Sequence, residues 1–284
     1  MSKPGIPIPL GTYDVFRDVN NWDEHTANQW AAALNLRASA DDQKSLRSQI
    51  IALAQVLPNQ TAVEIGCGTG ALLLDLALAV GKAGRIIGIE PQPVLAEVAK
   101  RNISEQNPGD VISVITDSAE HLPLPDAIAD NCFAQTVLIH LPANIRLKVL
   151  KEMVRIVKPG GRILSADQDG DTWIINHPDR ELTRRIIQFN SDQRYADGWT
   201  GRHLESLFRS AGLVNVKAIP HVHIDRDPDS YLFGMGKRIA AAAKDTGVLH
   251  EDEYLRWLDS LEWIAKKGDF FSSINYYCCL GLKP

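Results

Sequence analysis

Residues 63–70 read Val63-Glu64-Ile65-Gly66-Cys67-Gly68-Thr69-Gly70, a short apolar run with one acidic residue that opens into three alternating glycines. Glycines at alternate positions allow the backbone to turn sharply out of a strand and to approach a ligand without an intervening Cβ atom. The run Ala71-Leu72-Leu73-Leu74-Asp75-Leu76 follows directly and predicts a helix, whose unpaired N–H groups point at the same place. The segment therefore predicts a strand, a loop and a helix that hold a nucleotide-like ligand.

Composition narrows the class of protein. A chain of 284 residues with 45% hydrophobic and 23% charged residues is typical of a soluble globular protein with one large domain, or a domain and a cap. The formal net charge of −5 disfavours a nucleic acid as the main partner. The sequence shows neither a signal peptide nor an apolar window of roughly 18 residues that would predict a membrane span. Its four cysteines lack metal-ligand spacing, so we expect buried thiols and a cytoplasmic protein.

Strand and helix signals alternate from about residue 60, which is typical of a parallel sheet with helices on both faces. The run Pro159-Gly160-Gly161 ends one helix and turns the chain into a fifth strand. The expected strands are Ala62–Gly66, Arg85–Glu90, Ile112–Thr116, Asn131–Leu138 and Arg162–Asp167, and the expected helices between them are Ala71–Val80, Pro93–Glu105 and Asn144–Val157.

The flanking regions predict further helices and a last pair of strands. We divide the chain into an N-terminal helical lid segment (1–59), a nucleotide-binding core (60–167), and a C-terminal half of the sheet with inserted substrate-cap helices (168–284). The expected flanking helices are Trp22–Ala33, Asp41–Val56, Pro178–Gln193, Gly201–Ala211, Pro228–Lys244 and Glu251–Lys267, and the expected strands are Leu213–Ile219 and Ile274–Leu280.

The aromatic residues are unevenly placed along the chain. Of the 19 Phe, Trp and Tyr residues, only Phe133 lies between residues 60 and 167. The aromatics of the two flanks either pack a small cap or line an apolar pocket over the carboxyl-terminal edge of the sheet, where open α/β folds bind ligands. Both interpretations stay open at this point.

The glycine loop alone does not identify the nucleotide. Residues 66–71 also satisfy the dinucleotide fingerprint G-x-G-x-x-A, and Glu90 follows at the distance of a ribose-binding acid. An NAD-dependent oxidoreductase is therefore one alternative. Three features favour another class: Glu64 inside the first strand, the run Asp117-Ser118-Ala119-Glu120-His121-Leu122-Pro123 after the third strand, and the run Lys158-Pro159-Gly160-Gly161-Arg162 before the fifth.

Together these motifs resemble the class I S-adenosylmethionine (SAM)-dependent methyltransferases, in particular the small-molecule enzymes of ubiquinone and menaquinone biosynthesis. The resemblance covers residues 60–167 well and extends weakly to Tyr276–Pro284. It implies a doubly wound, mostly parallel seven-stranded sheet of the Rossmann-like methyltransferase fold, with residues 60–167 as the SAM-binding core. It also implies SAM as cofactor, S-adenosylhomocysteine (SAH) as product, and a small, partly apolar acceptor methylated at O, N or C. The resemblance favours secondary metabolites or quinone-like acceptors. The oligomeric state is not indicated.

The resemblance implies cofactor contacts from four strand ends. The glycine loop would lie under the methionine part and the ribose, with Glu64 beside the amino-acid group. Glu90 would accept both ribose hydroxyls, and Asp117 would accept from the adenine amino group. Residues 136–138 would border the transferred methyl group. The implied cofactor-binding residues are, in chain order, Glu64, Gly66, Cys67, Gly68, Thr69, Gly70, Glu90, Pro91, Gln92, Asp117, Ser118, Ala119, Thr136, Val137 and Leu138.

Two residues are candidates for the chemistry of transfer. Many relatives carry a His-His pair after strand four, but here Ile139 replaces the first histidine and His140 remains. His140 is the first candidate for a general base because imidazole titrates near neutral pH, although it could instead satisfy backbone groups at the start of the next helix. Asp167 would orient His140 or take the proton, unless it only forms a turn. The missing histidine leaves a non-methylating SAM-binding protein as a further alternative.

No metal site is predicted: His221-Val222-His223 lacks a third ligand.

Overall fold

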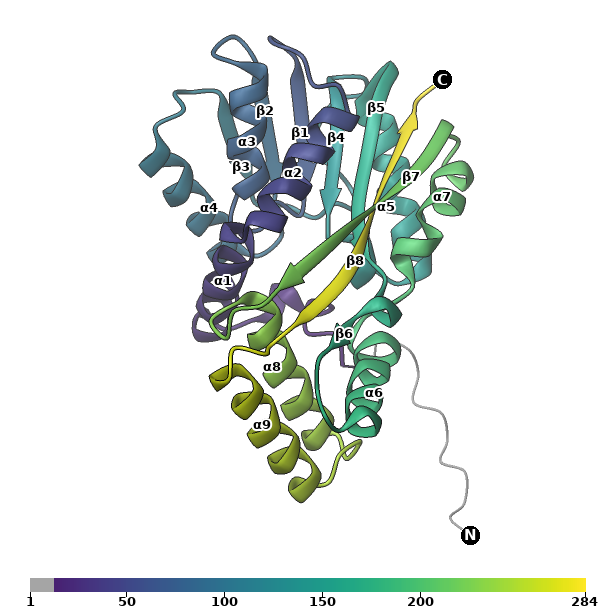
Figure 1. Cartoon of the computed structure of the whole chain (residues 1–284). Helices are drawn as coiled ribbons and strands as arrows, with labels where there is room; N and C mark the ends of the chain where they lie inside the picture. The colour runs from purple at the N-terminus through teal and green to yellow at the C-terminus, as the bar shows by residue number, and fades with distance from the viewer. Residues whose placement is uncertain (1–12) are drawn as a thin grey trace.

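The computed structural model describes residues 13–284, which form a single eight-stranded sheet with helices on both faces (Figure 1). The strands are β1 (Thr61–Ile65), β2 (Arg85–Ile89), β3 (Ile112–Ile115), β4 (Ala129–Gln135), β5 (Val157–Gln168), β6 (Ile174–Ile175), β7 (Val214–Asp225) and β8 (Ser272–Leu282). Strands β3, β2, β1, β4 and β5 lie side by side in that order and are parallel. Strand β8 is antiparallel to β5, β7 and the short β6. The predicted doubly wound α/β fold is confirmed, with β6 as an eighth strand.

The helices divide between the two faces of the sheet and a cap at one end. They are α1 (Glu24–Ser39), α2 (Asp41–Leu53), α3 (Ala71–Val80), α4 (Pro93–Gln106), α5 (Ala143–Ile156), α6 (Arg180–Phe189), α7 (Thr200–Ser210), α8 (Tyr231–Asp245) and α9 (Glu251–Lys266). One buried apolar cluster joins the sheet to α2 and α3 and continues into α6, α8 and α9, and a second joins the opposite face to α5 and α7. The sheet and the cap therefore share one continuous core.

Strand β1 shows how the sequence builds this sheet. Ala62, Val63 and Ile65 are completely buried because each face of the strand is covered by helices. Successive side chains point to opposite faces, so Ala62 belongs to one apolar cluster and Val63 to the other. The chain adds β2 and β3 on one side of β1 and β4 and β5 on the other. The crevice where open α/β sheets bind ligands is therefore expected at the carboxyl ends of β1 and β4.

Several element boundaries differ from the sequence prediction: α1 continues to Ser39 and β7 to Asp225, each six residues beyond the expected end, and three others differ for local reasons. Strand β4 ends at Gln135 because Thr136 has a φ of 58° and residues Leu138–His140 form a 3-10 turn. Strand β5 begins before the predicted Pro-Gly-Gly turn and contains it. The turn shifts the pairing register with β4, because Ala129 pairs with Val157 whereas Asn131 pairs with Arg162. Helix α6 continues as a π-helical turn rather than as the predicted regular helix to residue 193.

The N-terminal part of the described chain runs between the sheet and the cap. The backbone N–H of Tyr13 donates to Gln193 O, and the Gln92 side chain donates to Val19 O. Helix α1 then packs on α4 through Ala31. The first twelve residues of the predicted lid segment (1–59) lie outside the described residues.

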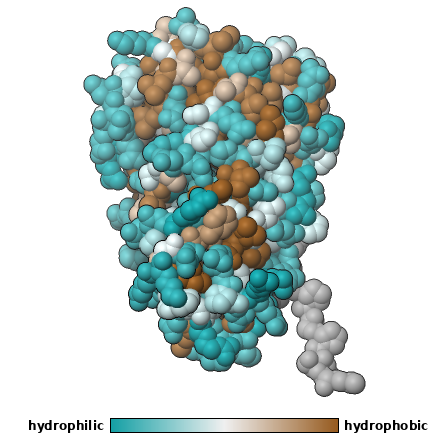
Figure 2. All heavy atoms as spheres, viewed as in Figure 1, coloured by the Kyte–Doolittle hydropathy of each residue, from teal (hydrophilic) through white to brown (hydrophobic). Residues whose placement is uncertain are grey.

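On the face drawn in Figure 2, one group of hydrophobic residues lies near the middle, where the sheet meets the cap. Within residues 13–284, no helix combines the length and the apolar character needed to cross a membrane. All four cysteines are free and buried, as their apolar settings predicted.

Candidate functional site

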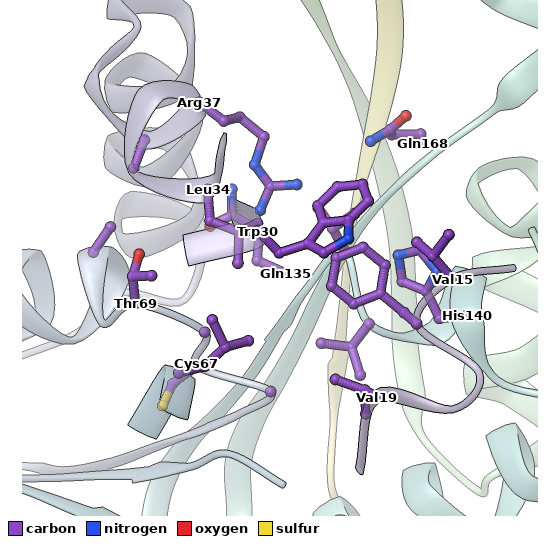
Figure 3. A pocket seen from close by; sticks show the side chains of 18 of the residues that line it. Val15, Val19, Trp30, Leu34, Arg37, Cys67, Thr69, Gln135, His140 and Gln168 are labelled. Carbon is purple, nitrogen blue, oxygen red and sulfur yellow. The ribbon is translucent and has the colours of Figure 1, made fainter. Parts of the chain in front are cut away.

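A cavity of about 200 Å³ lies at the carboxyl ends of β1, β2 and β4, beneath the cap. Its floor is the glycine loop after β1. Its roof is built from the segment before α1, from α1 itself, from the turn after α6 and from α8. Four aromatic rings line this roof, those of Phe16, Trp30, Tyr195 and Tyr231. In Figure 3 the Trp30 indole lies between Arg37 on one side and His140 on the other. The aromatic flanks of the sequence therefore line a pocket and do not only pack the cap.

The glycine loop adopts a backbone that other residues avoid. Gly66, Gly68 and Gly70 have φ values of 61°, 54° and 85°, in the left-handed region. A Cβ atom on Gly66 would lie 2.6 Å from Cγ2 of Val137, which is closer than two non-bonded carbon atoms approach one another. The loop therefore brings bare backbone to the floor of the cavity because glycine occupies these positions.

Glu90 holds this loop in place. Its Oε2 accepts a hydrogen bond of 2.8 Å from the Gly68 N–H, and its Oε1 accepts one of 3.0 Å from the Gln92 N–H. The side chain lines the cavity and is almost fully buried. Burial raises the pKa of Glu90 to about 7, although the two backbone hydrogen bonds oppose the shift. The carboxylate therefore titrates near neutral pH.

Glu64 places a second carboxylate on the same wall. Its Oε2 is buried and has no hydrogen-bond partner within residues 13–284. Burial raises the pKa of Glu64 well above its usual value, and the positive field of Arg47 opposes that change. A buried carboxylate oxygen without a partner is costly unless a ligand satisfies it. The floor of the cavity therefore fits a ligand that carries a cationic hydrogen-bond donor.

The predicted site residues fall into two groups. Those that line the cavity are Glu64, Gly66, Cys67, Gly68, Thr69, Glu90, Pro91, Thr136, Val137 and His140. Those that the structure does not place on its wall are Gly70, Gln92, Asp117, Ser118, Ala119, Leu138 and Asp167.

Members of the second group have other contacts. Gly70 is the N-cap residue of α3, and Leu138 is buried in the core. The Gln92 side chain accepts from the Val94 N–H and donates to Val19 O, so it caps α4 and fixes the N-terminal segment. The Asp117 carboxylate is exposed and accepts from the Ser118 N–H at 2.7 Å.

His140 is paired with a carboxylate that the sequence did not indicate. The Nδ1 atom of His140 lies 2.9 and 3.0 Å from the two carboxylate oxygens of Asp14. The backbone N–H groups of Phe16 and Ala196 also donate to Asp14, at 3.0 Å each, which fixes its orientation. We assign the imidazole proton to Nδ1 from this geometry, which leaves the Nε2 lone pair available.

Asp167 has a different role from the one expected. Its carboxylate is completely buried and accepts hydrogen bonds from the Ile139 N–H and the Ser165 hydroxyl, at 3.2 and 2.8 Å. Burial raises the pKa of Asp167. The partner of His140 is therefore Asp14, and Asp167 holds the backbone of the turn that carries His140.

Several polar residues that line the cavity were also absent from the sequence prediction. They come from segments far apart in the chain, and no local motif marks them. These residues are Arg37, Gln43, Arg47, Gln135, Gln168, Asn190, Arg194 and Arg238.

Comparisons with known proteins identify a methyltransferase domain in this chain. A family model described as a methyltransferase domain matches residues 62–161. An uncharacterized 37.1 kDa protein in a transposon of Streptomyces fradiae is 31% identical over 247 residues, which cover 86% of this chain and 68% of that protein. A demethylmenaquinone methyltransferase of Desulfitobacterium hafniense is 32% identical over 124 residues, 44% of this chain and about half (48%) of that enzyme. The YcgJ protein of Bacillus subtilis shares the fold, with a TM-score of 0.58 and 18% identity over 84% of this chain and 97% of that one.

The cavity fits the cofactor of this family. SAM carries an α-ammonium group, which matches the unpartnered oxygen of Glu64. It also carries two ribose hydroxyls, which match an acidic side chain such as Glu90 at the edge of a glycine loop. Sequence, fold and comparisons therefore agree: the chain belongs to the class I SAM-dependent methyltransferases.

Proposed function

We propose that this cavity binds SAM against the glycine loop and a small, partly apolar acceptor beneath the aromatic roof. The observation that carries the proposal is that one cavity holds both a carboxylate suited to the donor and a histidine–aspartate pair suited to the acceptor. The free carboxylate oxygen of Glu64 marks the donor side, and the His140–Asp14 pair lies on the same cavity near the aromatic rings. Donor and base are thereby brought to one enclosed space.

On the donor side, Gly66 and Gly68 support the methionine part and the ribose. Glu64 accepts from the ammonium group, and Glu90 accepts from the ribose hydroxyls while it keeps the loop in position. Pro91 lies beside the adenine. We retain Asp117 as the acceptor for the adenine amino group, since it follows β3, the neighbour of β2 in the sheet. That role needs the adenine to extend beyond the cavity wall described above.

On the acceptor side, the chain supplies a base and its positioning groups. SAM provides an electrophilic methyl group on a sulfonium leaving group. Nε2 of His140 takes the proton of an acceptor hydroxyl or amine, and Asp14 stabilises the imidazolium that forms. Asp167 is a positioning residue, because its hydrogen bond to the Ile139 N–H holds the turn next to His140. The roof excludes water and aligns the acceptor for in-line displacement.

The acceptor that best suits this roof has an apolar or aromatic body. Phe16 packs against Trp30, with ring centroids 4.9 Å apart, and against His140, at 4.5 Å. A flat acceptor lying along these rings would meet the imidazole at one end. Quinone-like and secondary metabolites have such bodies, and the name of the Desulfitobacterium relative points to a quinone acceptor for that enzyme.

Titration calorimetry tests the donor. We expect SAH to bind with a Kd in the micromolar range, as for many cofactors (about −8 kcal/mol), and NAD or NADH to give no heat at similar concentrations. Binding of NADH without a response to SAH would contradict the proposal and favour the oxidoreductase alternative. Incubation with tritiated SAM and a panel of acceptors then tests transfer. An acceptor that binds but is never labelled would favour a non-methylating member of the fold.

The pKa of Glu90 predicts a pH dependence of cofactor binding. Only the deprotonated carboxylate accepts from both ribose hydroxyls, and the pKa of Glu90 in the folded protein is about 7. The affinity for SAH should therefore rise roughly tenfold between about pH 6 and about pH 8, measured by calorimetry. Replacement by alanine should weaken binding by about 1–3 kcal/mol at the higher pH.

A matched pair of variants isolates this effect. Glu90→Gln should lose most of the pH dependence, whereas Glu97→Gln, at an exposed position of α4, should keep it. If Glu90→Gln retained the tenfold change, the placement of the ribose beside Glu90 would be wrong.

A further inference from the structure

The cap side of the cavity holds two arginines, Arg194 and Arg238, whose charges influence one another and that form no ion pair with a carboxylate within residues 13–284. Arg194 ends the π-helical turn after α6, and Arg238 lies on α8. Burial lowers the pKa of Arg194, and the positive field of Arg238 adds to that shift. Within residues 13–284, Arg194 Nε and Arg238 Nη2 are buried atoms without a hydrogen-bond partner. Two like charges thus share a partly buried space with donors to spare.

No acidic side chain neutralises this pair. Neither arginine takes part in an ion pair within the described part of the chain. Residues 1–12 contain no Asp or Glu, so they cannot supply a side-chain carboxylate either. Asp14 is the acidic group whose field reaches Arg194, but its oxygens already accept from His140 and from two backbone N–H groups.

Asn190 provides a second, independent observation. It begins the same π-helical turn, lines the same cavity and is completely buried. Neither its Nδ2 nor its Oδ1 has a hydrogen-bond partner within residues 13–284. Leaving a buried polar group unpaired destabilises a protein, and π-helical turns occur frequently at functional sites. An unpaired amide at this position indicates a place for a ligand.

The cofactor has its own cationic partners elsewhere. The arginines whose fields reach Glu64 are Arg47, which also pairs with Asp75, and Arg37, which also contacts the Tyr231 ring. The carboxylate of the methionine group can use these side chains. Arg194 and Arg238 are not among the groups that influence Glu64. The pair on the cap side is therefore left for the second substrate.

We propose that the acceptor carries an anionic oxygen group, a carboxylate or a phosphate, which Arg194, Arg238 and Asn190 bind at the cap end of the cavity. The proposal rests on the proposed methyl transfer and adds the charge of its substrate. The Arg238 guanidinium lies 5.6 Å from the centre of the Trp30 ring, and Phe16 continues the row of rings to His140. The anionic end is held at Arg238, and the nucleophilic end reaches the imidazole.

Paired probes test the charge directly. With the protein saturated by SAH, calorimetry compares 4-hydroxybenzoate with 4-hydroxybenzamide, and phenyl phosphate with phenol. We expect at least one anion to bind about 10-fold more tightly than its neutral partner, as suits charge-assisted hydrogen bonds. The better of the two anions distinguishes a carboxylate site from a phosphate site.

Three variants locate the effect. Arg194→Met and Arg238→Met should each abolish the preference for the anion while SAH affinity stays within about twofold. Arg209→Met, at an exposed position of α7, should leave the preference intact. Equal binding of the charged and neutral probes, or SAH binding with no response to either anion, would overturn the anion site and leave the donor site standing. Failure to bind SAH would instead contradict the proposed function.

Thermal stability gives a readout that a purely structural role would not share. If the two arginines await an anion, Arg238→Met relieves like-charge repulsion. Its Tm in anion-poor buffer should then equal or exceed that of the natural chain, and added phosphate should no longer raise it. If the arginines serve only to pack the cap, the same variant should lose more than about 4 °C, which corresponds to 1–2 kcal/mol in a chain of this size. That result would contradict the proposal.

Discussion

Replacing Gly66 by alanine is expected to weaken SAH binding by about 100-fold or more. Two costs combine. An alanine at a φ of 61° pays about 1–2 kcal/mol for the left-handed backbone. Its Cβ would also lie 2.6 Å from Cγ2 of Val137, and such overpacking typically costs about 1–3 kcal/mol. The loop relieves both by moving, which removes the surface on which the cofactor lies.

A rescue and a control make this test specific. The Cβ of Val137 is 3.6 Å from the position that the added methyl group would occupy, an ordinary contact, so Gly66→Ala with Val137→Ala should recover much of the affinity. Gly109→Ala has a φ of 77° but open space around its Cβ, so it should lower Tm slightly and leave SAH binding unchanged. Calorimetry and thermal melts of the four proteins suffice. Near-normal affinity in Gly66→Ala would show that the loop does not form the cofactor floor.

His140→Ala should reduce methyl transfer by about 100-fold or more, within the usual range for loss of a general base, with SAH affinity within about twofold. The side chain lies on the acceptor side, away from the groups proposed to hold the donor. The rate is measured as tritium transferred from labelled SAM to an acceptor found in the screen. Full activity would remove His140 from the chemistry.

The partner carboxylate allows a graded version of the same experiment. Asp14→Asn keeps the shape of the pair but removes its charge, so it should slow transfer by about 10-fold or more and leave the donor site intact. His121→Ala, at an exposed position that does not line the cavity, should behave as the natural protein. A loss of transfer in Asp14→Asn that matched its loss of SAH binding would indicate misfolding of the roof rather than a weakened base.

The donor side could be predicted from sequence because its signals are local. The glycine loop, the strand before it and Glu90 lie within about thirty residues and follow the geometry of one β-α-β unit. The prediction was less complete for side chains that form other hydrogen bonds in the folded protein. Gln92 was expected among the cofactor-binding residues, but its amide caps α4 and donates to Val19 O. Such hydrogen bonds depend on which segment crosses nearby.

The acceptor side could not be predicted in the same way, because its contacts join distant parts of the chain. Asp14 and His140 are 126 residues apart, and Arg194 and Arg238 lie on separate helical elements of the cap. The uneven distribution of aromatics indicated that the flanks matter, but not which polar residues accompany them. Asp167 was the natural sequence candidate because it lies near the end of strand β5, yet the position of Asp14 depends on how the N-terminal segment is fixed to the cap.

The segment that carries Asp14 also lines the cavity, so one stretch of chain both covers the site and orients His140. Tyr13 donates to Gln193 O and accepts from Arg194, Val19 accepts from Gln92, and Phe16 packs on Trp30, so the segment is fixed to the cap, to α4 and to α1. A displaced segment takes Asp14 and Phe16 away from the imidazole. The cover of the cavity and the orientation of His140 therefore depend on the same stretch of chain.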